Sequence, residues 1–425
     1  MHPTALGLVL IPLSLMWAFQ PVRLLQLALV AAIFEAAAAL VFGGFGLQPA
    51  MVPGLLFIMF VASQYALGMR YPGEAAALRA AFPLIALLVY AVLSAWLLPT
   101  LFAGQIFVAS QKPDPLAPNS LVPLEPTFGN VTQTLYLALN VIFTVAVAIF
   151  ITRAAIPYES IIAAYMLGGY VVVGLVFWEF GNRITGLPFP DDLLHSNPGW
   201  AIVKQGLGTV PRIQGPFSEP SALAGYTSGI AFCSLWLSIR GYRIMRPNLL
   251  LALALVAILL STSTTGIVTL VVGLPLTLAF ALVGSEPGAL GRIGKTFGCL
   301  LLGGLLTIGP IILLRPTLID SVNTVVESTL NKGDSDSYND RSAADIGALD
   351  TVGPSYGLGA GWGSYRSSSF IPGMLAEGGV FGIVMVVWLG MRVVRLGTRA
   401  RRASPLHPGR ILVDGFSASL FRSAS

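Results

Sequence analysis

The chain has 425 residues, of which 55% are hydrophobic and only 10% are charged, and its formal net charge is +5. Its apolar residues fall in long unbroken runs, many of about 20 residues, instead of the three-in-seven stripes of soluble helices. These features exclude an ordinary soluble globular protein. Orientation in a membrane is therefore a better first explanation of the positive charge than binding of nucleic acid. We therefore expect an all-α, polytopic membrane protein.

The apolar runs predict eleven transmembrane helices. The first run resembles a secretion signal, but it lacks a basic segment and a small-residue cleavage site, so we expect it to be the first span. In chain order, the expected spans lie near residues 3–19, 24–45, 51–69, 79–102, 131–152, 158–180, 219–239, 248–263, 265–283, 294–314 and 369–391.

The Lys and Arg residues orient these spans. Sixteen of the 24 would lie on one face, which the positive-inside rule makes cytoplasmic, and seven of the sixteen fall in a tail at 392–425. The other eight all fall in three long outer loops, at about 103–130, 181–218 and 315–368. They are Lys112, Arg183, Lys204, Arg212, Arg315, Lys332, Arg341 and Arg366.

Only short turns connect the other spans, and no internal repeat is evident. We therefore expect a single membrane domain over residues 1–425 with an elaborated outer face. The first outer loop is Pro-rich and carries only three charged residues, which suits a lid or spacer.

The stretch RIQGPFSEPSALAGY, which starts at Arg212, joins the second outer loop to the seventh expected span. Gly215 permits a sharp turn, and Pro216 and Pro220 restrict the backbone, so the stretch predicts a defined loop. Arg212 would offer a planar fork of donors for phosphate, and Glu219 at a partly apolar helix start would suit a general base. The alternative is that Glu219 only caps the helix that follows.

The third outer loop contains a second polar cluster. Its members are Tyr338, Asp340, Arg341, Asp345, Tyr365 and Arg366. Arg341 and Arg366, facing Arg212, would clamp a diphosphate; in the alternative, the loop is solvated and its arginines pair with its own aspartates. The alternating glycines between 357 and 363 free the backbone either to approach a ligand or to pack in a tight loop.

Three other polar features carry weaker signals. Glu35 is predicted at mid-span, where it would serve a proton pathway or be hydrogen-bonded between helices. The five hydroxyls of residues 261–265 would line a polar cavity or cap the next helix. His195 is a lone loop histidine, a kind that is usually not catalytic. No motif indicates a metal, ATP or a nucleophilic serine, so no cofactor is expected.

The run from Arg212 to Ser221 resembles the Arg-x-x-Gly-x-Phe-x-x-Pro signature of the O-antigen polymerase and ligase superfamily, in the Glu-Pro-Ser form of its exopolysaccharide polymerases. The hydroxyl-rich STSTTG resembles the Ser-rich span start of that superfamily. Arg341, followed by GPSYGLGAGWGS and EGGVFG, resembles its large outer loop and the Gly-x-x-Gly helix after it. The resemblance extends from about Lys204 to Trp388 and depends on the order of these elements.

The resemblance implies a GT-C-like glycosyltransferase of the bacterial inner membrane, with its active site facing the periplasm. Such enzymes use sugar chains attached to undecaprenyl diphosphate, need no metal, and join the reducing end of one chain to a hydroxyl of another. Membrane lipids, a chain-length regulator and a flippase are implied partners. By position, Arg212 and Arg341 would bind the diphosphate and neutralise charge on the leaving group. The residues expected to bind substrate are Arg183, Lys204, Gly215, Ser221, Tyr338, Tyr365 and Arg366.

The sequence departs from the ligase pattern at one place. Ligases carry a histidine shortly before the Gly-x-x-Gly segment, which is Gly379 to Gly382 in this chain, and the slot around Ser368 to Phe370 holds none. This disfavours a ligase that uses such a histidine and leaves Glu219 as the candidate base. The chain also stops soon after the eleventh expected span, where relatives have further helices.

Two classes of function are open. The first is a glycosyltransferase that polymerises lipid-linked repeat units, with an O-antigen ligase as the alternative inside that class. The second is a transporter or flippase of lipid-linked oligosaccharide. A transporter should show charged residues deep in several spans, broken helices and inverted repeats, whereas this sequence predicts only Glu35 at depth.

Overall fold

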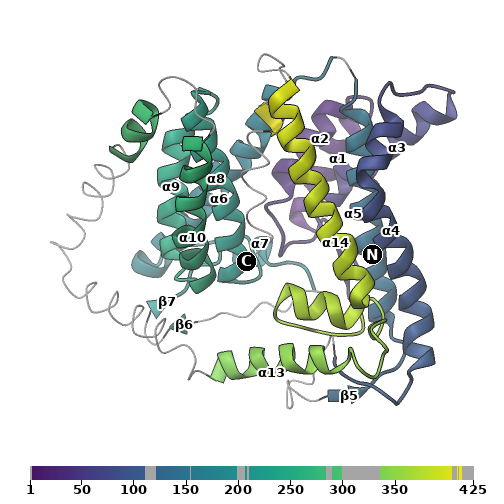
Figure 1. Ribbon diagram of the computed structural model, residues 1–425. Coiled ribbons are helices and arrows are strands. Elements are labelled where there is room, and N and C mark those ends of the chain that lie inside the picture. The colour runs from purple at the N-terminus through teal and green to yellow at the C-terminus, as the bar shows by residue number, and fades with distance from the viewer. Residues whose placement is uncertain are drawn as a thin grey trace. The chain divides into compact units, whose positions relative to one another are not determined.

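The computed structural model of the protein describes residues 2–110, 121–153, 155–198, 206–207, 210–283, 290–298, 336–403, 409 and 411–413 (Figure 1). Across these residues the chain is mostly helical, and its short strands form three small antiparallel sheets. The expectation of a helical protein is thus confirmed, with these strands as the departure from an all-α fold.

Five helices of the described chain are long and apolar enough to cross a membrane. They are α4 (Glu74–Leu101), α5 (Phe128–Phe150), α6 (Tyr158–Thr185), α8 (Pro220–Arg240) and α14 (Phe370–Ala403). The shorter apolar helices are α1 (Ala5–Met16), α2 (Pro21–Ala31), α3 (Met51–Ala66), α9 (Pro247–Leu260) and α10 (Thr264–Val283). Helices of this kind indicate a membrane-embedded protein. The number of spans and the side on which each loop lies stay predictions.

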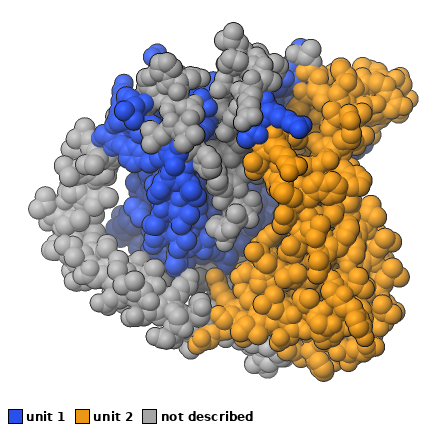
Figure 2. Space-filling view, in the orientation of Figure 1, with its two compact units in different colours: residues 1–60, 155–329, 397–425 blue, residues 61–154, 330–396 orange. Residues whose placement is uncertain are grey.

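The chain folds into two compact units (Figure 2). Unit 1, blue in the figure, comprises residues 1–60, 155–329 and 397–425, and unit 2, orange, comprises residues 61–154 and 330–396. The second expected outer loop therefore belongs to unit 1, and the described part of the third belongs to unit 2. The single membrane domain over 1–425 stays a prediction.

Helix α8 forms the core of unit 1. Most of its residues are buried, and it packs against α6, α9 and α10 (Figure 1). A Cβ at Gly273 of α10 would lie only 2.3 Å from Cζ of Phe232, so the two helices meet where one has no side chain. Small residues at such contacts let helix backbones approach closely in lipid. Pro220, Leu223 and Ala224 are buried too, so the first turn of α8 also lies in this packed core.

The range 24–45 is not the single span that its apolar run predicts. Helix α2 ends at Ala31, and an irregular segment follows at 32–39. The next elements are β2 (Leu40–Phe42) and β3 (Phe45–Leu47), which form a hairpin, and β1 (His2–Pro3) pairs with β2. Gly43 has a φ of 58°, as a two-residue hairpin turn favours. Alanines 36 to 39 are fully buried, so tertiary packing overrides the apolar run.

Unit 2 contains a helix that the apolar runs do not predict. This helix, α13 (Asp336–Asp350), lies in the third expected outer loop and is polar, so it lacks the run by which spans are recognised. It packs near β4 (Phe107–Ala109), which pairs with β5 (Leu121–Pro123). Helices α4 and α5 pack against each other in the same unit.

The alternating glycines of this loop serve close packing. Gly361 and Gly363 have φ values of 99° and 78°, which favour glycine. A Cβ at Gly361 would lie 2.7 Å from the carbonyl oxygen of Ser94, and one at Gly363 would lie 3.0 Å from Cα of Asn130. The Asn130 Nδ2 group also donates to the carbonyl of Trp362 over 2.8 Å. Of the two alternatives for the glycines, the structure shows the tight loop.

Helix α14 continues to Ala403, beyond the expected span end near 391, so the start of the predicted tail at 392–425 is helical. Gly379 interrupts the helix with a φ of 60° and a ψ of −162°. A Cβ at this glycine would lie 2.3 Å from the carbonyl oxygen of Gly357. Helix α14 is therefore kinked at the EGGVFG run, where the glycine-rich segment around Gly357 packs directly against it.

Candidate functional site

The candidate site of unit 1 is built on residues 212–219, which we call the signature loop. The loop leads into α8 from β7 (Val210–Pro211), which pairs with β6 (Gly206–Leu207). Its residues between Arg212 and Glu219 are buried, and these two end residues are half-buried. Gly215 has a φ of 58°, the left-handed conformation that a glycine permits. A defined loop thus carries both the arginine and the glutamate, as the sequence predicts.

Glu179 of α6 holds the middle of the signature loop. Its Oε2 accepts the backbone N–H groups of Gln214, over 3.2 Å, and of Gly215, over 2.7 Å. Its Oε1 accepts Nη2 of Arg183, one helical turn away, over 3.2 Å. Glu179 is not among the residues that the sequence pattern predicts to be functional. The available signal was an acid in an apolar helix, four residues before an arginine.

His195 holds the same loop from a second direction. It directly follows α7 (Asp191–Leu194), and its Nδ1 lies 2.8 Å from Oδ1 of Asp191. Because a carboxylate only accepts, Nδ1 carries a proton and donates it. The Nε2 atom faces the carbonyl oxygen of Phe217 and Nε2 of Gln214, each at 3.2 Å. The histidine that the sequence treats as an isolated loop residue therefore lies against the signature loop.

The irregular segment at 32–39 borders the loop on a third side. The amide of Ala36 donates to the carbonyl of Pro216 over 3.3 Å, and the carbonyl of Ala36 accepts the amide of Asn197 over 3.1 Å. Non-helical backbone is tolerated in membrane proteins where protein groups satisfy it in this way. The prediction that Glu35 lies in the middle of a membrane-spanning helix is therefore wrong. Glu35 is half-buried in this irregular segment, next to Ala36, which contacts the signature loop.

Glu219 occupies the N-cap position of α8, yet its side chain makes no capping hydrogen bond to that helix. Its Oε1 instead accepts the hydroxyl of Ser221 in a short hydrogen bond. The structure thus brings together the predicted base and one predicted substrate-binding residue. The capping alternative holds for the backbone of Glu219, whose carbonyl accepts the amide of Leu223, but not for its carboxylate.

The other predicted residues of unit 1 lie at the edge of the loop. Arg183, in the last turn of α6, pairs with Glu179 while its side chain stays 34% exposed. Gly215 forms the turn itself. Lys204 lies outside the described residues.

The predicted residues of the third outer loop lie in unit 2. Arg341 is half-buried on α13 and Arg366 is exposed. Tyr365 is buried, and its hydroxyl donates to the carbonyl of Ala344 over 3.0 Å. Burial, with the nearby charges of Asp350 and Asp345, raises the pKa of Tyr365 to about 12. Tyr338 belongs to α13, and its side chain lies outside the described part.

Asp345 on α13 binds the chain that enters α14. Its Oδ1 accepts the hydroxyl of Ser367 and the amides of Ser368 and Ser369, over 2.7 to 3.0 Å. Burial acts to raise its pKa, but these bonds and the Ser369 hydroxyl outweigh burial and hold the pKa below its usual range. Because Arg341 and Arg212 belong to different units, the clamp that joins them stays a prediction.

The hydroxyl cluster between α9 and α10 binds its own turn. The Ser261 hydroxyl donates to the carbonyl of Ile258 over 2.6 Å and accepts the amide of Ser263 over 3.3 Å. Ser261 and Ser263 are buried. These bonds close the turn that ends α9, and both alternatives, a polar cavity and capping of the next helix, stay predictions.

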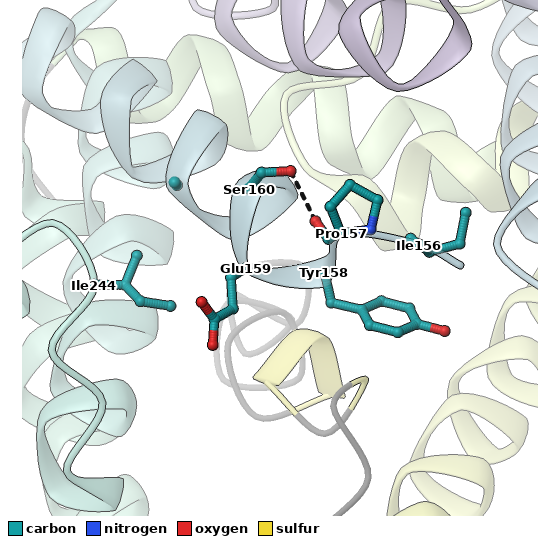
Figure 3. Close-up of a pocket in the computed structure, with 7 residues that line it drawn as sticks. Ile156, Pro157, Tyr158, Glu159, Ser160 and Ile244 are labelled. Atoms are coloured by element: carbon teal, nitrogen blue, oxygen red, sulfur yellow. Dashed lines mark hydrogen bonds between the residues drawn. The ribbon is translucent and has the colours of Figure 1, made fainter. Parts of the chain in front are cut away.

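A cavity of about 550 Å³ lies at the start of α6 in unit 1 (Figure 3). It is lined by Ile156, Pro157, Tyr158, Glu159, Ser160, Ala163 and Ile244. With a rise of about 1.5 Å per residue, Glu159 and Glu179 are separated by about 30 Å along α6. The cavity is therefore remote from the signature loop.

The described contacts thus define one ordered site in unit 1, in which Glu179, His195 and Ala36 hold a loop that ends in Arg212 and Glu219. Its two predicted functional groups are close in sequence, and the groups that hold the loop come from elsewhere in the chain. No family model, curated protein or solved structure matches this chain.

Proposed function

We propose that the protein is a membrane glycosyltransferase that polymerises undecaprenyl-diphosphate-linked oligosaccharide repeat units into an exopolysaccharide or O-antigen, at the periplasmic face of the bacterial inner membrane. The observation that carries this proposal is the signature loop, which has a half-buried arginine and a half-buried glutamate at its two ends and a buried, hydrogen-bonded turn between them. The resemblance of this loop to the signature of O-antigen polymerases and ligases supports it, as do the helices of membrane-spanning length.

In the proposed reaction, a sugar hydroxyl of one lipid-linked chain attacks the anomeric carbon at the reducing end of another. A carbon–oxygen bond forms at that carbon while its bond to the diphosphate oxygen breaks, and undecaprenyl diphosphate leaves with the bonding electrons. Glu219 takes the proton of the hydroxyl. Arg212, together with Arg341, neutralises the charge that develops on the diphosphate. A direct displacement of this kind inverts the anomeric centre.

The contact between Ser221 and Glu219 supports the role of Glu219 as the base. A catalytic base must be oriented by a neighbouring group, and the Ser221 hydroxyl donates to the Glu219 carboxylate. The side chain is not engaged in capping α8. The activated leaving group supplies the driving force, so the reaction needs no nucleotide.

A transporter or flippase of lipid-linked oligosaccharide is the second candidate, and two observations favour it. Transporters contain broken helices and buried charged groups. Unit 1 has the irregular segment at 32–39 after α2, and it has the buried Glu179. An O-antigen ligase is the alternative inside the enzyme class, because it would move the same donor to a different acceptor.

Polysaccharide length in a deletion strain tests the proposal. The strain is complemented with wild type, Arg212→Ala, Arg341→Ala and, as a control, Arg70→Ala, which removes an exposed arginine of the expected cytoplasmic face. With equal amounts of protein in the membrane, we expect long polymer from wild type and Arg70→Ala and only short units from the other two. Equal complementation by all four would contradict the diphosphate clamp.

Two further observations separate the alternatives. A deletion strain that still makes long lipid-linked polymer but does not transfer it would indicate a ligase. Purified protein in detergent separates chemistry from translocation, because a micelle has no two sides between which a flippase could move a lipid. Lipid-linked units that grow longer in detergent support a polymerase, and units that stay unchanged favour the transporter.

A further inference from the structure

We propose that Glu179 is a positioning residue for the transferase reaction, which holds the signature loop through two backbone amides and so sets Arg212 and Glu219 in their working places. The inference rests on the proposed function for its chemistry. The contacts that carry it are independent of that function.

The burial of Glu179 requires an explanation. The residue is only 2% exposed, and a carboxylate is buried at high cost unless it is paired and hydrogen-bonded. Within the described part of the chain, three donors meet this carboxylate: the Arg183 guanidinium on Oε1, and the amides of Gln214 and Gly215 on Oε2. An ion pair with Arg183 alone would not involve the two backbone amides. Their hydrogen bonds therefore give the carboxylate a second role, which is to hold the signature loop.

These amides lie in the middle of the signature loop. Gln214 and Gly215 follow Arg212 by two and three residues, and Glu219 comes four residues after Gly215. With Gly215 in the left-handed conformation, the two successive N–H groups converge on one oxygen, as they do in backbone anion sites. Buried amides need an acceptor, and Glu179 supplies it from α6, a different element.

The hydrogen bonds that Glu179 accepts fix the distance between Arg212 and Glu219, the two functional ends of the loop. Without its acceptor, the turn at Gly215 is free to rearrange, and Arg212 and Glu219 lose their fixed separation. A displacement of about 1 Å at reacting groups is enough to slow a reaction about 100-fold. Glu179 therefore acts on the rate without touching the substrate.

Arg183 directs the carboxylate of Glu179. Its Nη2 lies 3.2 Å from Oε1, one turn further along α6, so Oε2 is turned toward the loop. The pair also compensates the buried charge of Glu179. Arg183 is thus a partner of Glu179 in addition to its proposed contact with substrate.

Glu179→Gln and Glu179→Asp test this role. Glutamine keeps the size of the side chain, but its single oxygen and its NH₂ group cannot accept from Arg183 and from both amides at once. Aspartate keeps the charge with a shorter reach. Glu159→Gln is the matched control, because it makes the same change at an exposed glutamate on the same helix, far from the signature loop.

The measurements use the full-length protein in detergent, with lipid-linked repeat units as substrate. For Glu179→Gln we expect kcat to fall about 100-fold while KM changes by less than about threefold. Hydrogen exchange should become about tenfold faster at Gln214 and Gly215 and stay unchanged in α9. Glu179→Asp should give intermediate values, and Glu159→Gln should match the wild type.

Two results would overturn the inference. One is wild-type kcat and wild-type loop exchange in Glu179→Gln. The other is faster exchange throughout α9 as well as the loop in both variants, which would show a purely structural role. If the wild-type protein does not lengthen its substrate, the proposed function fails, and hydrogen exchange still decides on Glu179: faster exchange confined to the loop supports the inference, and unchanged exchange refutes it.

Discussion

Gly215→Ala is a sharp test of the signature loop, because unit 1 contains a matched control. Gly215 has a φ of 58°, and Gly186, the C-cap of α6, has a φ of 75°. An alanine in this left-handed region costs about 1–2 kcal/mol. The new Cβ would lie 3.4 Å from Cγ2 of Val176 at position 215 and would meet no described atom within 4 Å at position 186. The two variants should therefore lose nearly the same free energy of unfolding.

The same two variants should differ in activity. The amide of Gly215 donates to Glu179 over 2.7 Å, so a turn that relaxes away from the left-handed region moves that amide and the ends of the loop. We expect Gly215→Ala to elongate lipid-linked units about 100-fold more slowly and Gly186→Ala to keep the wild-type rate. Thermal unfolding in detergent and an elongation assay measure the two quantities. Equal rates in both variants would refute the idea that loop conformation controls the reaction.

Three further predictions concern single carboxylates. Glu219→Gln should lower the rate by about 10²–10⁴ with little change in melting temperature, because glutamine still accepts the Ser221 hydroxyl; a normal polymer length distribution would remove Glu219 from the mechanism. Asp191→Asn removes the charged acceptor of His195 and should weaken the loop by about 1–2 kcal/mol, seen as faster hydrogen exchange in 212–219, whereas the exposed neighbour Asp192→Asn should leave exchange unchanged. Asp345 has a lowered pKa when folded, so its contribution to stability is present above the ordinary carboxyl pKa and is lost as pH falls through the lowered value. Asp345→Asn should therefore reduce the acid sensitivity of thermal unfolding, and an unchanged pH profile would contradict this.

The helical, membrane-embedded class and the shape of the signature loop follow from local sequence. A run of about 20 apolar residues has the length of a membrane span whatever lies around it. Gly215 and Pro216 act on their own backbone, so a turn before α8 is predictable without knowledge of its neighbours. The expected span at 24–45 shows where this reasoning stops. An apolar run suits a protein interior as well as lipid, and the contacts of Ala36 with Pro216 and Asn197 decide for the interior.

The groups that hold the loop could not be predicted from sequence. Glu179 precedes Gln214 by 35 residues, and His195 precedes it by 19. An acid near the end of an apolar helix carries no mark of the backbone amides that it will accept, because hydrogen bonds form only between groups that packing brings within about 3 Å. Composition thus indicates that this chain folds in a membrane. Contacts between distant segments decide which of its few charged groups lie together.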